Sequence, residues 1–315
     1  MLQEACQERS GISAIIAGML LITGGTGFIG SRFTQKLIQS DHAVRVLLRP
    51  QKTNPRLPRN VSMEIAVSSL QDPRSLRAAL KNVKTVFHFA TAEHHFPIAD
   101  YESVDIQGTR NLIEAARDAG VERMLYLSRV GAEKKSFYPV LKAKAMAEEI
   151  IRESGISHTI IRLTDVFGNN DHLTTPIATA VMHSPLILTI PGDGKMNLQP
   201  LWIEDLLTCL MLIYEENIFE NRTYELGGGE YFNFMAMLKL IVKRMKKNRI
   251  ILPVSPAYLR LYNLWFKQQQ DRFPLSTLWL DLLAVDRTCP LNSLPRTFGL
   301  LPARFTHHLD YLERR

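Results

Sequence analysis

Short apolar runs alternate with longer segments of helical periodicity through the first half of the chain. The apolar runs predict strands at residues 20–23, 43–48, 61–67, 83–90, 124–128 and 159–163. Apolar positions that recur every three to four residues predict helices at 27–40, 72–80, 111–119 and 139–154. This alternation is typical of the α/β class with a doubly wound parallel sheet. Such a sheet carries its ligand crevice at the carboxyl ends of its strands.

A glycine-rich turn follows the first predicted strand directly. The segment Thr23-Gly24-Gly25-Thr26-Gly27-Phe28-Ile29-Gly30 joins that strand to the first predicted helix. In such a turn Gly24 permits the tight bend, Gly27 lets the backbone approach a pyrophosphate, and Gly30 lets the helix pack against the sheet. The helix N-terminus adds N–H donors and a positive dipole. A dinucleotide site, rather than a purely structural turn, is therefore predicted at Gly24, Thr26, Gly27, Phe28, Ile29 and Gly30.

The alternation loosens after about residue 170, and this divides the chain into three parts. We interpret 1–18 as an N-terminal extension and 19–170 as a Rossmann-type dinucleotide-binding domain. Residues 171–315 would form a smaller mixed domain for substrate or partner, with some strands returning to the Rossmann sheet; helices are predicted there at 203–214 and 234–248. Met19 directly precedes the first strand and is a candidate translation start, with a flexible N-terminus as the equal alternative.

Composition narrows the class of protein. The chain of 315 residues is 46% apolar and 22% charged, which excludes a disordered or low-complexity chain. Three widely spaced cysteines do not make a disulfide framework or a cysteine zinc site, and they favour a reducing cytoplasm. No apolar run approaches the roughly 18 residues of a membrane-spanning helix.

Several short segments resemble the atypical and extended short-chain dehydrogenase/reductases. These are TGGTGFIG, FHFA, YLS and IIRLTDVFG, and the later PGDGK, LQPLWIEDL, YELGGGE and FGLLPARFTHHLDYL resemble the group around the 39-kDa subunit of respiratory complex I. The resemblance implies NAD(P) binding, with Ala90 at the end of the FHFA strand beside the cofactor. It also implies that Asp105 and Thr109 buttress the cofactor strand, where Asn is common at the first position; a purely structural helix is the equal alternative.

The end of the second strand bears on the choice of cofactor. Arg49 follows that strand, Lys52 comes soon after, and no acid stands nearby to accept a ribose 2′-hydroxyl. A guanidinium can bind a 2′-phosphate through two hydrogen bonds, and Arg32 could join it. We therefore expect NADP(H), with NAD as the alternative. The acid that relatives place after the third strand to contact adenine is replaced by serine, at Ser68 or Ser69.

Relatives with catalytic activity use a Tyr four residues before a Lys on one helix, together with a Ser from the preceding strand. The lysine lowers the tyrosine pKa for proton transfer. Tyr138 and Lys142 match that spacing, but Pro139 and Glu148 fit the family pattern better in a second register, in which Lys144 is the lysine and Val140 replaces the tyrosine. Ser128 matches the serine. The candidate catalytic residues are thus Ser128, Lys144 and, outside the helix, Tyr138.

Three functions remain open at this point. The first is an NADP(H)-binding protein with weak or no turnover near a membrane or respiratory complex, because a valine cannot transfer a proton. The second is an NADPH-dependent oxidoreductase of a quinone-like or carbonyl substrate. A nucleotide-sugar epimerase or dehydratase is third, since it normally depends on the missing tyrosine. No metal site is expected, although His88 lies in the fourth predicted strand and His94 and His95 come soon after it.

The positive charge is concentrated in one segment. Between Glu230 and Asp271 the chain has eight basic residues and no acidic one. The net charge of the whole chain is +7, so this segment accounts for the basic excess. Basic residues beside apolar and aromatic ones in 234–267 suit a membrane surface or an acidic protein partner. The alternative is a solvated helix face over a small core. No nucleic-acid-binding module is recognisable.

Overall fold

A seven-stranded parallel sheet forms the centre of the computed structural model, which describes residues 18–50, 62–93, 99–217, 221–265 and 277–313. Its order is β11-β6-β5-β4-β1-β2-β3. The strands are β1 (Met19–Thr23), β2 (Val44–Leu48), β3 (Glu64–Val67), β4 (Val83–His88), β5 (Arg123–Arg129), β6 (Ser157–Leu163) and β11 (Arg222–Leu226). The predicted doubly wound α/β sheet is confirmed, and β11 joins it from the second half of the chain.

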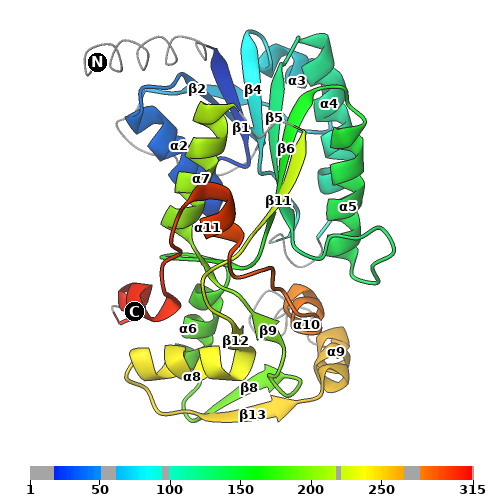
Figure 1. The fold of residues 1–315 in the computed structure, drawn as a ribbon. Helices are drawn as coiled ribbons and strands as arrows, with labels where there is room; N and C mark the ends of the chain where they lie inside the picture. Colours follow the sequence, from blue (N-terminus) through cyan, green and yellow to red (C-terminus); the bar gives the residue numbers. More distant parts are fainter. Residues whose placement is uncertain (1–17, 51–61, 94–98, 218–220, 266–276, 314–315) are drawn as a thin grey trace, which may run out of the picture.

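Helices cover both faces of this sheet (Figure 1). One face packs on α2 (Phe28–Gln39) and α7 (Ile203–Glu216), and the other on α3 (Pro73–Ala79), α4 (Gly108–Asp118) and α5 (Pro139–Arg152). The helix predicted at 111–119 starts earlier, because a π-helical segment, η1 (Glu102–Gln107), runs directly into α4. None of the described helices is long and apolar enough to cross a bilayer.

A small lobe lies below the carboxyl ends of the strands in Figure 1. It contains α6 (Thr174–His183), α8 (Phe234–Arg244), α9 (Pro256–Trp265), α10 (Thr277–Leu282), η3 (Phe305–His308) and η4 (Asp310–Leu312). The helix α11 (Ser293–Phe298) instead packs beside β11, on the core of the main sheet. Three two-stranded pairs complete the lobe: β7 (Val166–Phe167) with β10 (Leu201–Trp202), β8 (Ile187–Pro191) with β13 (Ile250–Val254), and β9 (Asn197–Leu198) with β12 (Phe232–Asn233). A separate apolar core, which includes Phe167, Phe234 and Phe305, holds the lobe together.

Candidate functional site

The glycine-rich turn has the shape that a pyrophosphate requires. Gly24 has a φ of +70°, and a Cβ there would lie 2.7 Å from the backbone of Phe89 and Ala90. A Cβ on Gly30 would lie 2.3 Å from the Gly24 carbonyl oxygen, so α2 packs directly against the turn. At Gly27, by contrast, the closest atom to an added Cβ is 3.3 Å away. Gly27 is the N-cap of α2, and no side chain caps that end. The residues present therefore fit a dinucleotide.

A cleft of about 210 Å³ opens beside this turn, between the sheet and the small lobe. Seven of the site residues predicted from the sequence line this cleft: Gly24, Gly27, Phe28, Ile29, Gly30, Ser128 and Lys144. Thr26 is exposed at the tip of the turn, and Ala90 adjoins Gly24 and donates its N–H to the Thr23 hydroxyl at 3.2 Å. The small lobe contributes apolar walls through Leu173, Pro176, Leu278, Trp279 and Leu282.

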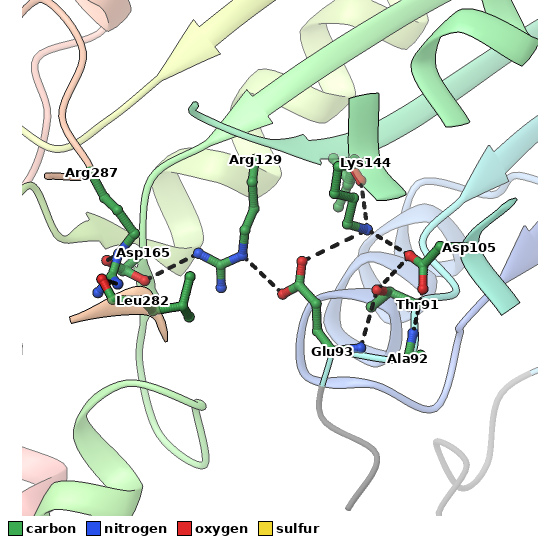
Figure 2. Close-up of polar contacts among 10 residues, drawn as sticks. Thr91, Ala92, Glu93, Asp105, Arg129, Lys144, Asp165, Leu282 and Arg287 are labelled. Atoms are coloured by element: carbon green, nitrogen blue, oxygen red, sulfur yellow. Dashed lines mark hydrogen bonds and ion pairs between the residues drawn. The ribbon is translucent and has the colours of Figure 1, made fainter. Parts of the chain in front are cut away.

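Lys144 is buried and lines this cleft, and Figure 2 shows its contacts with carboxylates. Its Nζ is 3.3 Å from Asp105 Oδ1 and 3.9 Å from Glu93 Oε1. Burial by itself lowers the pKa of Lys144, but Tyr126, Asp105 and Glu93 outweigh it and raise the pKa above its ordinary value. Asp105 is fixed in turn, because it accepts hydrogen bonds from the Thr91 hydroxyl and the Ala92 N–H. Lys144 is therefore a permanent cation, already paired with carboxylates.

The ion pairs continue beyond Lys144 into the small lobe, as Figure 2 shows. Glu93 accepts from Arg129 Nε at 3.0 Å, and Arg129 Nη1 lies 3.4 Å from Asp165. Asp165 also accepts from Arg287 Nε at 2.6 Å. The six residues, hereafter the buried ion chain, are Asp105, Lys144, Glu93, Arg129, Asp165 and Arg287. Sequence reasoning identified Lys144 and Asp105 but not the other four, which have no motif and come together only in the fold.

The helix that carries Lys144 gives the two candidate lysines different surroundings. Lys142 is exposed, whereas Lys144 is buried in the cleft. Val140 is 2% exposed and packs with Leu141, Leu278 and Leu282. Tyr138 is the residue before α5, and its ring is partly buried against that same apolar cluster. No hydroxyl group stands at position 140, one turn before Lys144.

The Ser128 side chain forms a hydrogen bond with a residue of α5. Its hydroxyl donates to Glu148 Oε1 at 2.6 Å. Burial raises the pKa of Glu148, but hydrogen bonds from Arg162 and Ser128 outweigh it, so the pKa lies below its ordinary value. Arg162 donates to both oxygens of Glu148, at 2.9 and 2.8 Å. Glu148 thus joins α5 to strands β5 and β6, and Ser128 forms part of that link.

The residues expected near the adenosine end meet different surroundings. Arg49 is exposed immediately after β2, its contact with a 2′-phosphate stays a prediction, and Lys52 lies outside the described residues. The Arg32 guanidinium donates to the Asn169 carbonyl at 2.8 Å and pairs with Glu204 of α7. Arg32 is thus held by α7 and the Asn169 carbonyl, and a contact with a 2′-phosphate stays a prediction.

His88 is a core residue between two hydroxyl groups. Its ring nitrogens lie 2.7 Å from Thr23 Oγ1 and 2.9 Å from Thr109 Oγ1. Burial, with the Lys144 charge, lowers the pKa of His88 to about 3, so the ring is neutral at physiological pH. His94 and His95 lie outside the described residues. Within the described part of the chain, no group of acidic, histidine or cysteine side chains is arranged to hold a metal ion.

Comparisons with known proteins agree with the glycine-rich turn and the fold. A family model described as NAD(P)H-binding matches residues 24–185. The ceramide reductase of Caulobacter vibrioides is 28% identical over 93% of this chain and 86% of that protein. The photosystem II assembly factor Ycf39 of Cyanophora paradoxa is 24% identical, over 77% of this chain and 73% of that protein.

A third relative is NADH dehydrogenase (ubiquinone) 1 alpha subcomplex subunit 9 of Arabidopsis thaliana, a mitochondrial protein. It is 25% identical over 80% of this chain, which spans 62% of that protein's length. Two solved structures share the fold at low identity. The UDP-glucose 4-epimerase of Thermus thermophilus with NAD has a TM-score of 0.70 at 20% identity and covers 94% of this chain and 98% of that one. An epimerase of Methanothermobacter thermautotrophicus has a TM-score of 0.73 at 18% identity, covering 97% and 94%. The resemblance stated from the sequence is confirmed.

Proposed function

Because the chain belongs to the NAD(P)H-binding family, we propose that it holds NADP(H) and turns over substrate weakly or not at all. The observation that carries this proposal is the buried Val140 at the tyrosine position, one turn before Lys144. General acid–base catalysis by a placed side chain typically contributes about a hundredfold or more to a rate. A valine supplies none of it, while the glycine-rich turn that binds phosphates is intact.

Each end of the dinucleotide has a candidate partner in this chain. The N-terminus of α2 would face the pyrophosphate, and Arg49 would meet the 2′-phosphate of NADP(H). Lys144 would lie against the nicotinamide ribose, oriented by Asp105 and Glu93. A bound dinucleotide supplies hydride chemistry at its nicotinamide. The protein contributes a buried cation and a cleft with apolar side chains of α10 in its wall.

The proposal extends to where the protein acts. Two relatives bear names from photosynthetic and respiratory membrane complexes, and their roles support a role in assembly or attachment here. We place the protein in the cytoplasm, peripheral to a membrane or a larger assembly, with the basic segment 234–267 as the contact. Cys209 and Cys289 are free and buried, in keeping with a reducing compartment.

A second candidate function is the NADPH-dependent reduction of an uncharged carbonyl or quinone-like compound. The buried ion chain favours it, since each of its cations already lies within 4 Å of a carboxylate. A cleft with balanced charges and apolar walls suits a neutral substrate, and one relative is a ceramide reductase. A nucleotide-sugar epimerase or dehydratase has less support, because a diphosphate would have to displace carboxylates from Arg129 or Arg287.

Two measurements on the purified protein test these proposals. Fluorescence titration should give tighter binding of NADPH than of NADH, and equal affinity would refute the NADP(H) preference. NADPH consumption should stay near background across a screen of quinones and aldehydes. Steady turnover of one compound would replace the first function with the second.

A further inference from the structure

The two-stranded sheet of β8 and β13 exposes one aliphatic face, at the end of the small lobe opposite the main sheet (Figure 1). The strands pair in parallel, with Ile187 opposite Ile250 and Thr189 opposite Leu252. Ile187, Ile250 and Leu252 are 50%, 58% and 48% exposed. Side chains alternate along a strand, and the residues that point the other way, such as Leu188, are buried in the core of the lobe. The core therefore lies on one side of this sheet only.

Other exposed apolar side chains adjoin this sheet in the chain. Leu186 directly precedes β8, and Tyr258 and Leu261 lie on α9, which begins two residues after β13. The six side chains, hereafter the β8/β13 face, are Leu186, Ile187, Ile250, Leu252, Tyr258 and Leu261. Large apolar side chains scattered singly need no explanation, but a group on one end of a lobe marks an interaction surface.

A row of lysines borders the β8/β13 face. Lys239, Lys243 and Lys247 follow at four-residue spacing along α8 and the turn after it, and all three are exposed. Together with Arg249, which directly precedes β13, and Ile251, which points to the core side of that strand, they line one groove along its edge. Among the described residues, these three lysines and Lys246 form no ion pair. The neighbouring Arg244, by contrast, pairs with Asp310 and Glu313.

The apolar side of α8 does not belong to this surface. Leu238, Ile241 and Val242 are buried in the core of the lobe. This agrees with the alternative interpretation of the sequence, a solvated helix face over a small core. The cations come from α8, and the exposed apolar side chains come from the strands and α9. This division gives an aliphatic face with a cationic border, formed by segments that are far apart in the chain.

We propose that the β8/β13 face docks on an anionic lipid bilayer, with the lysine row meeting the lipid headgroups, an inference that rests on the peripheral role proposed above and names its surface and partner. The choice of occupant rests on charge complementarity and on the kind of side chain. No acid occurs between Glu230 and Asp271, and the exposed apolar groups are mainly aliphatic, with a tyrosine among them. Aliphatic groups that enter the acyl boundary beside lysines at the headgroups are the combination that binds a membrane surface. An acidic protein would match the lysines but not the aliphatic face.

Sedimentation with lipid vesicles tests the proposal on the full-length protein. One set of vesicles contains phosphatidylcholine alone, and the other contains phosphatidylcholine mixed with phosphatidylglycerol. The protein should sediment with the mixed vesicles only, and added salt should weaken the binding because the attraction is screened. NADPH titration of every variant shows whether its fold and dinucleotide site are intact, so failure here is distinguishable from failure of the proposed function.

Two double variants separate the two parts of the surface. Lys243→Glu with Lys247→Glu should weaken vesicle binding about twentyfold or more, since each lysine near an anionic surface contributes about fivefold. Ile250→Ser with Leu252→Ser should weaken it about tenfold, through the loss of buried apolar area. The matched control is Ile65→Ser with Val67→Ser, because these side chains are similarly exposed on β3, at the edge of the main sheet. This control should bind like the unaltered protein.

Other results would overturn the proposal. Absence of binding to the mixed vesicles would do so, and so would equal binding to both kinds of vesicle with no effect of the lysine variant. Retention on immobilised polyglutamate without vesicle binding would instead identify an acidic protein as the partner.

Discussion

Replacing Lys144 with methionine should destabilise the protein strongly, even without a cofactor. The side chain of Lys144 is 5% exposed, and its ammonium lies 3.3 Å from Asp105 and 3.9 Å from Glu93. With an effective dielectric constant of about 20, these two attractions amount to roughly 5 and 4 kcal/mol before the cost of desolvation. Removing one partner of a buried pair typically costs about 3–5 kcal/mol, because the remaining charge is left uncompensated. We expect a loss in that range.

A second substitution tests whether the unpaired carboxylates are the cause. Asp105→Asn removes one negative charge and keeps a carbonyl acceptor for Thr91 or Ala92. In the double variant, Glu93 still pairs with Arg129 at 3.0 Å, so less charge is stranded. Lys144→Met with Asp105→Asn should therefore cost less than the sum of the single variants, with a coupling of about 1–3 kcal/mol.

The assay is urea unfolding at neutral pH, without dinucleotide. Lys142→Met is the matched control, because Lys142 lies on the same helix with its side chain exposed, and it should change stability by less than about 0.5 kcal/mol. A loss below about 1 kcal/mol for Lys144→Met would refute the buried-pair argument, as would strict additivity with Asp105→Asn.

Four further predictions concern the dinucleotide site and its supports. Gly27→Val should leave the fold largely intact, because an added Cβ would meet only the Gly24 carbonyl oxygen, at 3.3 Å, and a shift of a few tenths of an ångström relieves that contact, but should weaken NADPH binding about tenfold or more by obstructing the pyrophosphate; unchanged affinity would remove the central claim. Arg49→Ala should weaken NADPH about tenfold and leave NADH nearly unchanged in parallel titrations. Tyr138→Phe should alter any turnover by no more than a few-fold, whereas a hundredfold loss would move proton transfer to Tyr138. The folded-state pKa of Glu148 is depressed, so its stabilisation is complete above the unfolded pKa and disappears as the pH falls through the folded one; Glu148→Gln should flatten the acid side of the stability-against-pH curve.

Local signals in the sequence predicted most of the main sheet, and long-range contacts account for what they missed. The strands were predictable because buried parallel strands are continuous apolar runs. The glycine-rich turn was predictable because only glycine fits at position 24, beside Ala90, and at position 30, beside Gly24. The start of α4 was missed because the preceding Glu102–Gln107 has only two apolar residues and forms a π-helical segment, which lacks the periodicity of an α-helix. Lys144 was predictable from its spacing to Pro139 and Glu148. Glu93, Arg129, Asp165 and Arg287 were not, since each contacts residues at least 36 positions away in the chain.

The placement of β11 has a consequence for any attempt to divide the chain. This strand pairs with β6 along Thr159–Leu163, and α7 supplies several side chains to the core on that face of the main sheet. A fragment that ended near residue 170 would retain the glycine-rich turn but lose an edge strand and a covering helix. It would expose β6, most of whose residues are buried in the whole protein, as a bare edge, and such an edge is a template for aggregation. The nucleotide-binding half is thus continuous in space but discontinuous along the polypeptide, because elements of the small lobe both precede and follow β11.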